Sequence, residues 1–253
     1  MFRSDPRVQA ALFTGTLTLY IATATPGAFW LDSSELAAAG VTLGIPHAPG
    51  HPLYLILAHA ASLVPVGSIG FRLAMLSALC GALAVTLVYA LTMRLAAVTL
   101  DARPPDWAAA LPAVAFALSE ALWLQSVRAE VYTLHLLIAL GLLVVAIDWT
   151  LSKDRRPGPL WSAAFLLGLG GGNHHLLLLA LMPAVAVLLL ADTARRSAVR
   201  RALPGATLAA MTGPRPSTAS ISSIEAASSP SRSPKAAATT SATVVPTCGI
   251  RRP

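Results

Sequence analysis

The sequence predicts an all-α protein whose helices cross a membrane several times. Of its 253 residues, 55% are apolar and 11% are charged, whereas an ordinary soluble domain has about 25% charged residues. Several apolar stretches approach the roughly 20 residues that a helix needs to cross the bilayer core. The histidines and most loop acids also fall on one side of the predicted membrane, and most loop arginines and lysines fall on the other. This sorting indicates that the His-rich side binds a polar ligand or performs chemistry.

The apolar stretches define six predicted spans. A glycine run and then Asn173, His174 and His175 separate the last two, which predicts a tight turn at the membrane surface. The first stretch has an alternative interpretation as a secretory signal, because a basic N-terminus precedes it and residues 22–24 resemble a cleavage site. Its uncharged length, from Val8 to Leu31, favours a retained first helix. The spans cover about residues 8–27, 72–92, 107–126, 131–150, 160–173 and 175–191.

The basic residues predict the orientation of these spans, with the N-terminus inside the cell. Cytoplasmic loops of membrane proteins are enriched in lysine and arginine. With the N-terminus inside, only Arg72 and Arg128 lie in outer segments. The inner segments hold Arg3, Arg7, Arg94, Arg103, Lys153, Arg155, Arg156, Arg195, Arg196, Arg200 and Arg201. We therefore expect a multi-pass protein of the cell inner (plasma) membrane with a cytoplasmic N-terminus.

The longest outer segment, about residues 28–70, contains two predicted short helices, one over 35–43 and an apolar interfacial one over 53–63. From Pro204 the composition changes to Ser, Thr, Ala and Pro without helical periodicity, which is typical of disorder. We therefore expect a transmembrane domain over 1–203 and a disordered tail over 204–253. No span follows the last arginine-rich loop, so we also expect that the domain is truncated and that the tail is unnatural.

Asp32 and Glu35 directly follow the first predicted span, and two interpretations of them stay open. Asp-x-x-Glu at the start of a helix can be a capping box, in which both carboxylates accept backbone N–H groups. Alternatively, one carboxylate accepts a proton from an attacking hydroxyl group or binds a metal ion. The two interpretations are compatible, because a capped carboxylate is also held rigidly.

His47 and His51 flank a turn in which prolines and glycine exclude a regular helix. They are either solvated surface histidines or part of a loop that binds an anion through imidazole and backbone N–H groups. A zinc site is not expected, because neither cysteines nor an HExxH spacing supports one. No metal ligands are assigned from the sequence.

Further polar groups fall at the same predicted membrane face. Arg128 and Glu130, in the short turn before the fourth span, either pair with each other or offer a guanidinium group to a phosphodiester. Asn173 and His174 lie at the outer end of the fifth span, and His135 lies one turn into the fourth. A lone histidine within a membrane is often a packing residue, but several polar groups at one face favour a shared site.

Four ordered motifs give the chain a specific resemblance to a known family. They are WLDSSELAAAGVTLGIPHAPGHPLY, FRLAMLSALCGALA, QSVRAEVYTLH and GLGGGNHH. Over roughly residues 8–200 the chain resembles a bacterial membrane family catalogued as domain of unknown function 2723, which is related to eukaryotic protein O-mannosyltransferases.

The resemblance implies a GT-C-like membrane glycosyltransferase that uses a polyprenyl-phosphate sugar donor. It makes Asp32 the candidate general base and Glu35 its partner. The transferred sugar would be mannose, and the acceptor would be Ser or Thr of an exported protein or another acceptor at the outer face. A divalent metal is compatible with these residues and not required by them. Candidate substrate-binding residues are His47, His51, Arg72, Arg128, Glu130, Asn173 and His174.

Two other functions remain as alternatives. The first is a transporter or flippase of a polar or lipid-linked substrate, and the second is an inactive fragment of the enzyme. A transporter commonly has repeated halves and polar groups at the membrane midplane, whereas this sequence has no visible repeat and its polar groups gather at one face. Nucleic acid is not an expected partner, because the basic residues form short clusters between apolar spans. Cys80 and Cys248 are too few for a disulfide framework.

Overall fold

The computed structural model describes residues 4–27, 32–100, 103–151 and 158–190. The predicted tail over 204–253 lies outside these ranges. Helices and connecting loops make up everything that the structure describes, and no strand occurs within it, which confirms an all-α protein. The helices are α1 (Pro6–Ala22), α2 (Ser33–Thr42), α3 (Pro52–Ser62), α4 (Ile69–Thr99), α5 (Asp106–Ala117), α6 (Glu120–Ser126), α7 (Tyr132–Leu151) and α8 (Gly158–Leu190).

Fewer of these helices are long and apolar enough to cross a membrane than the six spans drawn from the sequence. Within the described ranges, α4, α7 and α8 meet this condition, and the bent pair α5–α6 makes a fourth if it counts as one span. The first predicted span is shorter than expected. Helix α1 has 17 residues and ends at Ala22. Pro26 disfavours helix at Thr25, and the Thr25 N–H group donates to the Val127 carbonyl.

The third predicted span is broken rather than straight. Helices α5 and α6 meet at an angle of 64°, and the hydroxyl group of Ser119 caps the start of α6 by accepting from Leu122 N–H. The two short helices predicted in the longest outer segment are confirmed as α2 and α3, with bounds that differ by one or two residues. Helix α3 is apolar and too short to be a span.

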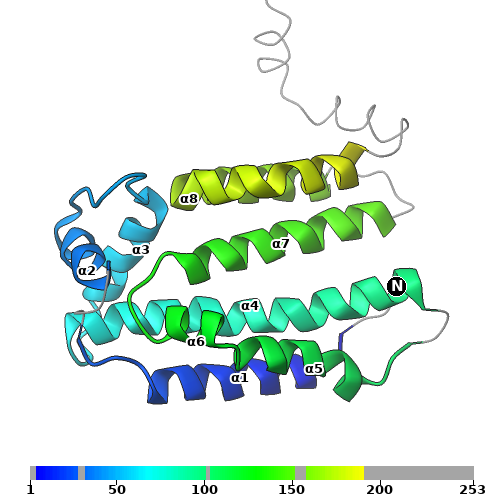
Figure 1. Cartoon of the computed structure of the whole chain (residues 1–253), viewed down its shortest axis with the longest axis horizontal. Helices are drawn as coiled ribbons and strands as arrows, with labels where there is room; N and C mark the ends of the chain where they lie inside the picture. Colours follow the sequence, from blue (N-terminus) through cyan, green and yellow to red (C-terminus); the bar gives the residue numbers. More distant parts are fainter. Residues whose placement is uncertain (1–3, 28–31, 101–102, 152–157, 191–253) are drawn as a thin grey trace, which may run out of the picture. The chain divides into compact units, whose positions relative to one another are not determined.

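Helix α8 folds back on itself at His174. The backbone of His174 is non-helical, with φ −153° and ψ 85°. A Cβ atom on Gly170 would lie 3.0 Å from a methyl carbon of Leu178, although eight residues of straight helix rise about 12 Å. The arms 158–173 and 175–190 therefore pack side by side (Figure 1), as the predicted turn required. Each arm rises about 24 Å, which is less than the roughly 30 Å of a bilayer core, so α8 meets the length condition only when both arms are counted as one helix.

Helix α4 is central in the bundle. Helices α1 and α5 pack along one side of it, α7 packs along the other, and α8 packs on α7 (Figure 1). An ion pair joins α4 to α7, in which Arg94 Nε donates to Asp148 Oδ1 over 2.7 Å. The Tyr20 hydroxyl group of α1 donates to the Ala117 carbonyl of α5 over 2.8 Å. These polar contacts satisfy groups that would be costly to leave unpaired among apolar helices.

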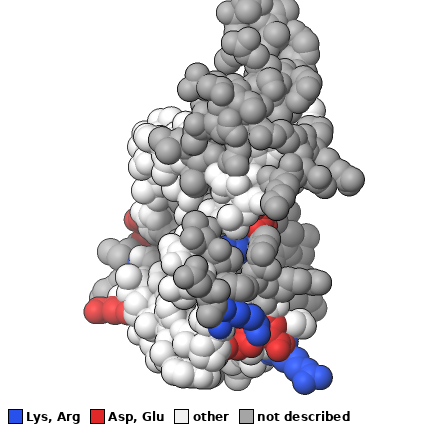
Figure 2. All heavy atoms as spheres, turned by 90° about the vertical axis from the view of Figure 1, so that its right-hand side faces the viewer, with Lys and Arg blue, Asp and Glu red and all other residues white. Residues whose placement is uncertain are grey.

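The two ends of this bundle differ in character. Helices α2 and α3, residues 127–131 and the turn at His174 lie together at one end, which we call the α2–α3 end (Figure 1). Figure 2 looks onto the opposite end, where a few basic and acidic side chains of the described residues lie close together. Ion pairs there include Arg103 with Asp106. The segments that the sequence assigned to the outer face thus gather at one end of the helices.

Close packing at Gly40 fixes α2 against α3, so Gly40→Ala should destabilise the α2–α3 end. A Cβ atom at Gly40 would lie 2.9 Å from Ala58 Cβ, a clash that the two rigid helices relieve only by moving apart. We expect a loss of about 1–3 kcal/mol, as for other overpacked sites. The matched control is Gly15→Ala in α1, because nothing lies within 4 Å of that position. Thermal unfolding in detergent measures both changes, and equal unfolding temperatures for the two variants would contradict the close packing.

Candidate active site

Asp32 precedes α2 but does not cap it. Its backbone is helical, with φ −75° and ψ −7°, and its carboxylate makes no capping hydrogen bond. A capping residue normally has an extended backbone, which turns its side chain toward the first N–H groups of the helix. The capping-box interpretation of Asp32 and Glu35 is therefore wrong. The Asp32 carboxylate instead lines a cavity at the α2–α3 end.

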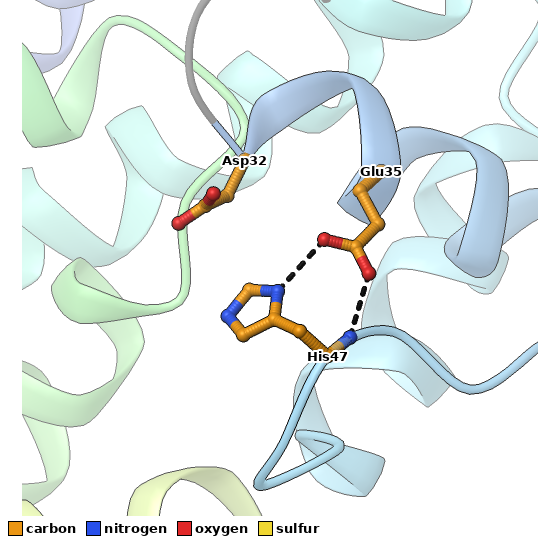
Figure 3. Close-up of side chains that lie close together, drawn as sticks. All are labelled: Asp32, Glu35 and His47. Atoms are coloured by element: carbon orange, nitrogen blue, oxygen red, sulfur yellow. Dashed lines mark hydrogen bonds and ion pairs between the residues drawn. The ribbon is translucent and has the colours of Figure 1, made fainter.

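Glu35 binds the loop before α3 through His47. Its Oε1 accepts the backbone N–H group of His47 over 2.6 Å, and its Oε2 lies 2.7 Å from His47 Nδ1. Figure 3 shows the His47 ring between the carboxylates of Asp32 and Glu35. The side-chain hydrogen bond from His47 lowers the pKa of Glu35, and the same contact raises the pKa of His47. Both side chains are exposed, so solvent screens the attraction between them.

His51 is the buried counterpart of His47. Gly50, with φ +90°, makes the turn between them, a conformation that favours glycine because it has no Cβ. The His51 side chain is 2% exposed, and its Nδ1–H group donates to the Asn173 carbonyl over 2.6 Å. The Asn173 amide group donates to the Val131 carbonyl over 3.1 Å. Asn173 thereby connects the His51 loop to the start of α7.

The histidine rings form a series across the α2–α3 end. The centroid of the His51 ring lies 5.7 Å from that of His47 and 5.3 Å from that of His174. The His174 ring in turn lies 6.0 Å from the rings of both Tyr132 and His135. The two arms of α8 place His174 here, because the helix reverses at this residue.

Arg128 and Glu130 form a buried ion pair between α6 and α7. Arg128 Nη2 lies 3.3 Å from Glu130 Oε1, and the side chains are 10% and 2% exposed. Arg128 Nη2 also donates to Gln125. Burial raises the pKa of Glu130; Arg128 opposes this shift and Asp32 adds to it. The Ser77 hydroxyl group of α4 holds the backbone of Glu130 by accepting its N–H group over 3.1 Å.

These elements enclose a cavity of about 220 Å³, which we call the polar cavity. Five of the nine sequence-predicted site residues line it, and Glu35, Arg128 and Asn173 contact lining residues without being among them. Arg72 lies outside it, because its guanidinium group donates to the carbonyls of residues 62, 66 and 67. The cavity is lined by Asp32, Leu36, His47, Ala48, Pro49, His51, Glu130, Val131, Tyr132, His174 and Leu176.

A second cavity, the apolar groove, adjoins the first. It has a volume of about 290 Å³ and shares Tyr132 with the polar cavity. In its wall, Thr133 Oγ1 and His135 Nδ1 are buried without a hydrogen-bond partner among the residues that the structure describes. Sequence reasoning missed Tyr132, although it lies two residues after Glu130 in the third motif. The groove is lined by Phe116, Ala121, Leu122, Gln125, Tyr132, Thr133, His135, Leu136, Ala139 and Leu177.

Known proteins share the part of the chain that builds this site. Residues 32–198 match the family model of the protein O-mannosyl-transferase TMEM260 N-terminal domain. Protein O-mannosyl-transferase TMEM260 of Mus musculus is 33% identical over 150 residues, which are 58% of this chain and 19% of the mouse protein. Its namesake in Dictyostelium discoideum is 24% identical over 159 residues, 60% of this chain and 19% of that protein. No solved structure matches the chain significantly.

The chain spans about a fifth of the length of these two relatives. The matched region begins at Asp32 and contains every residue that lines the polar cavity. The matched region covers more than half of the chain. The chain therefore belongs to the family of the protein O-mannosyl-transferase TMEM260 N-terminal domain.

Proposed function

We propose that this chain forms the donor-binding and catalytic part of a GT-C-type membrane glycosyltransferase. The enzyme transfers a sugar from a polyprenyl-phosphate donor to a Ser or Thr hydroxyl group of an exported protein. The family resemblance indicates that this sugar is mannose. The two relatives named protein O-mannosyl-transferase support the transfer of mannose. The order of the four sequence motifs supports the GT-C type and the relationship to domain of unknown function 2723.

The junction of the two cavities at Tyr132 is the observation that carries the proposal. A polyprenyl-phosphate sugar has a polar head and a long apolar chain, so its site needs a polar and an apolar compartment in contact. The polar cavity holds carboxylates and imidazoles, and the apolar groove beside it is lined mostly by apolar side chains of α5, α6 and α7. Ligand sites commonly combine an apolar surface with a few polar groups in this way.

Asp32 acts as the general base in this mechanism. The acceptor oxygen attacks the anomeric carbon of the donor sugar, the bond from that carbon to the phosphate oxygen breaks, and the lipid phosphate leaves with the bonding electrons. Asp32 accepts the hydroxyl proton, so charge and atoms balance. Its carboxylate is available for this role because it does not cap α2, and positioned general bases contribute about 10²–10⁴-fold to rates.

The remaining groups of the site bind and orient the substrate. His51 and His174 line the polar cavity and offer hydrogen bonds to the sugar-phosphate head. Arg128 lies behind Glu130 and supplies positive charge near the leaving phosphate. Asn173 holds His51 through its carbonyl group, so it positions an imidazole rather than touching the substrate.

The charge bias of the loops supports an orientation in which the α2–α3 end faces outward from the plasma membrane. Single cysteines at Val64 and Thr99, in a variant without Cys80 and Cys248, test it. In intact cells an impermeant maleimide should label Val64→Cys and leave Thr99→Cys unlabelled until the membrane is opened. Both positions are exposed in the structure, so the reverse labelling pattern would contradict the orientation.

Transfer from a radiolabelled mannosyl polyprenyl phosphate to a Ser/Thr peptide tests the function directly. Product should form with the wild-type protein, and Tyr132→Ala should raise the donor KM about tenfold through the loss of one aromatic contact. Tyr132→Phe should retain the wild-type KM, because the ring remains. Trp107→Ala is the matched control, since Trp107 is an exposed aromatic residue that lines neither cavity. No transfer by the wild type, or equal effects at Tyr132 and Trp107, would contradict the proposal.

A further inference from the structure

Three side chains of the types that bind metal ions lie close together beside the polar cavity. Asp32 and Glu35 extend from the start of α2, and His47 extends from the loop before α3 (Figure 3). One ligand atom from each of the three lies within 4.8 Å of the others. Figure 3 also shows that the second ring nitrogen of His47 lies on the side of Asp32. The three groups come from two separate segments, and the tertiary fold brings them together.

The distances suit a site that closes around an ion. Oxygen and nitrogen ligands lie about 2.0–2.2 Å from a divalent transition metal ion, which places neighbouring ligands roughly 3 Å apart. Glu35 Oε2 and His47 Nδ1 lie 2.7 Å apart as hydrogen-bond partners, and an ion that binds between them would replace the shared proton, because metal ligands must be deprotonated. All three residues are exposed, so a change of rotamer at Asp32 can bring its carboxylate closer to Glu35 and His47 without disturbing a packed core.

The cavity behind these side chains contains an unpartnered polar atom, which indicates a ligand. Glu130 lines the cavity, and its buried carboxylate pairs with Arg128 at 3.3 Å. His174 also lines it, and its Nδ1 is buried without a hydrogen-bond partner among the described residues. Asp32 and Glu130 line the cavity and Glu35 contacts its lining residue His47, so carboxylates gather where a cation would be attracted.

We infer that Asp32, Glu35 and His47 form a binding site for one divalent cation of the Mn²⁺ type, with its open coordination positions directed to the polar cavity. Two carboxylates and one imidazole combine the oxygen ligands that Mg²⁺ and Mn²⁺ prefer with the nitrogen ligand that transition metals accept. Three protein ligands leave positions for water or substrate, as in catalytic metal sites. The ion binds the phosphate of the sugar donor; this role, but not the site itself, rests on the proposed function.

Electron paramagnetic resonance of Mn²⁺ added to the full chain in detergent tests the site in the absence of donor. Bound Mn²⁺ loses the sharp six-line spectrum of the free ion, so titration gives the affinity and stoichiometry. We expect one saturable site, and at least tenfold weaker binding in Asp32→Asn, Glu35→Gln and His47→Gln. Spin-echo modulation should show one imidazole nitrogen on the bound ion, which His47→Gln removes. Circular dichroism confirms that each variant keeps its helices.

Matched controls separate this site from adventitious surface binding. Glu120→Gln and His175→Ala remove an exposed carboxylate and an exposed imidazole outside the polar cavity, and both should bind Mn²⁺ as the wild type does. No saturable binding up to about 1 mM, the weak end of functional calcium sites, would overturn the inference. Equal weakening in the controls, or wild-type binding in all three site variants, would overturn it too. Mn²⁺ binding without sugar transfer would refute the proposed function and leave the metal site standing.

Discussion

Asp32→Asn should reduce sugar transfer by at least about 10²-fold and leave the protein folded, because asparagine keeps the shape of the side chain but accepts no proton. Transfer of radiolabelled mannose to a Ser/Thr peptide, measured with saturating donor and saturating Mn²⁺, gives the change in kcat. Saturation with the ion matters, because Asp32 is also assigned to the metal site. A loss that persists at saturation separates the role as base from the role as ligand.

Asp32→Ala is the second variant for this experiment. An aspartate that caps a helix contributes about 1 kcal/mol, but the Asp32 carboxylate makes no capping bond. We therefore expect Asp32→Ala to unfold at the wild-type temperature and to be as inactive as Asp32→Asn. Normal transfer by the asparagine variant would contradict the assignment of Asp32 as the general base. An alanine variant of clearly reduced stability would instead show that the side chain supports the helix.

Arg128→Met should destabilise the protein by about 3–5 kcal/mol, because it leaves the buried carboxylate of Glu130 without its ionic partner. The two side chains are 10% and 2% exposed, so water does not replace the lost guanidinium group. At roughly 2–4 °C per kcal/mol for a chain of this size, the unfolding temperature in detergent should fall by roughly 6–20 °C. Thermal unfolding monitored by size-exclusion fluorescence measures it.

The double variant Arg128→Met with Glu130→Gln provides the control. Removing both charges removes the cost of an unpaired buried ion, and replacing both members of such a pair is often close to neutral. The double variant should therefore be more stable than Arg128→Met alone and should regain most of the lost unfolding temperature. If the double variant instead loses the sum of what Arg128→Met and Glu130→Gln lose separately, the two side chains do not stabilise each other. The lost stability of Arg128→Met would then come from other contacts of Arg128.

The sequence by itself determined the helical class of the protein and which segments lie at the same end of its helices. The length and apolarity of the segments predict helices in a membrane, and these are local properties of the chain. Because each predicted span reverses the chain, alternate loops fall at one end, which is why the segments at Asp32, Arg128 and His174 meet. Glycine followed by polar residues predicted the reversal within α8, and the backbone of His174 confirms it.

Only the tertiary structure decided which side chains contact each other. The spacing of Asp32 and Glu35 predicted a capping box, but Glu35 binds His47, twelve residues away. Arg72 was predicted to bind substrate, whereas in the structure its guanidinium group donates hydrogen bonds to nearby backbone carbonyls. Tyr132 joins two cavities whose walls come from five helices and the loops between them. A local pattern sets backbone conformation and burial, whereas the partner of a polar side chain depends on which distant segments pack beside it, and that is a property of the folded chain.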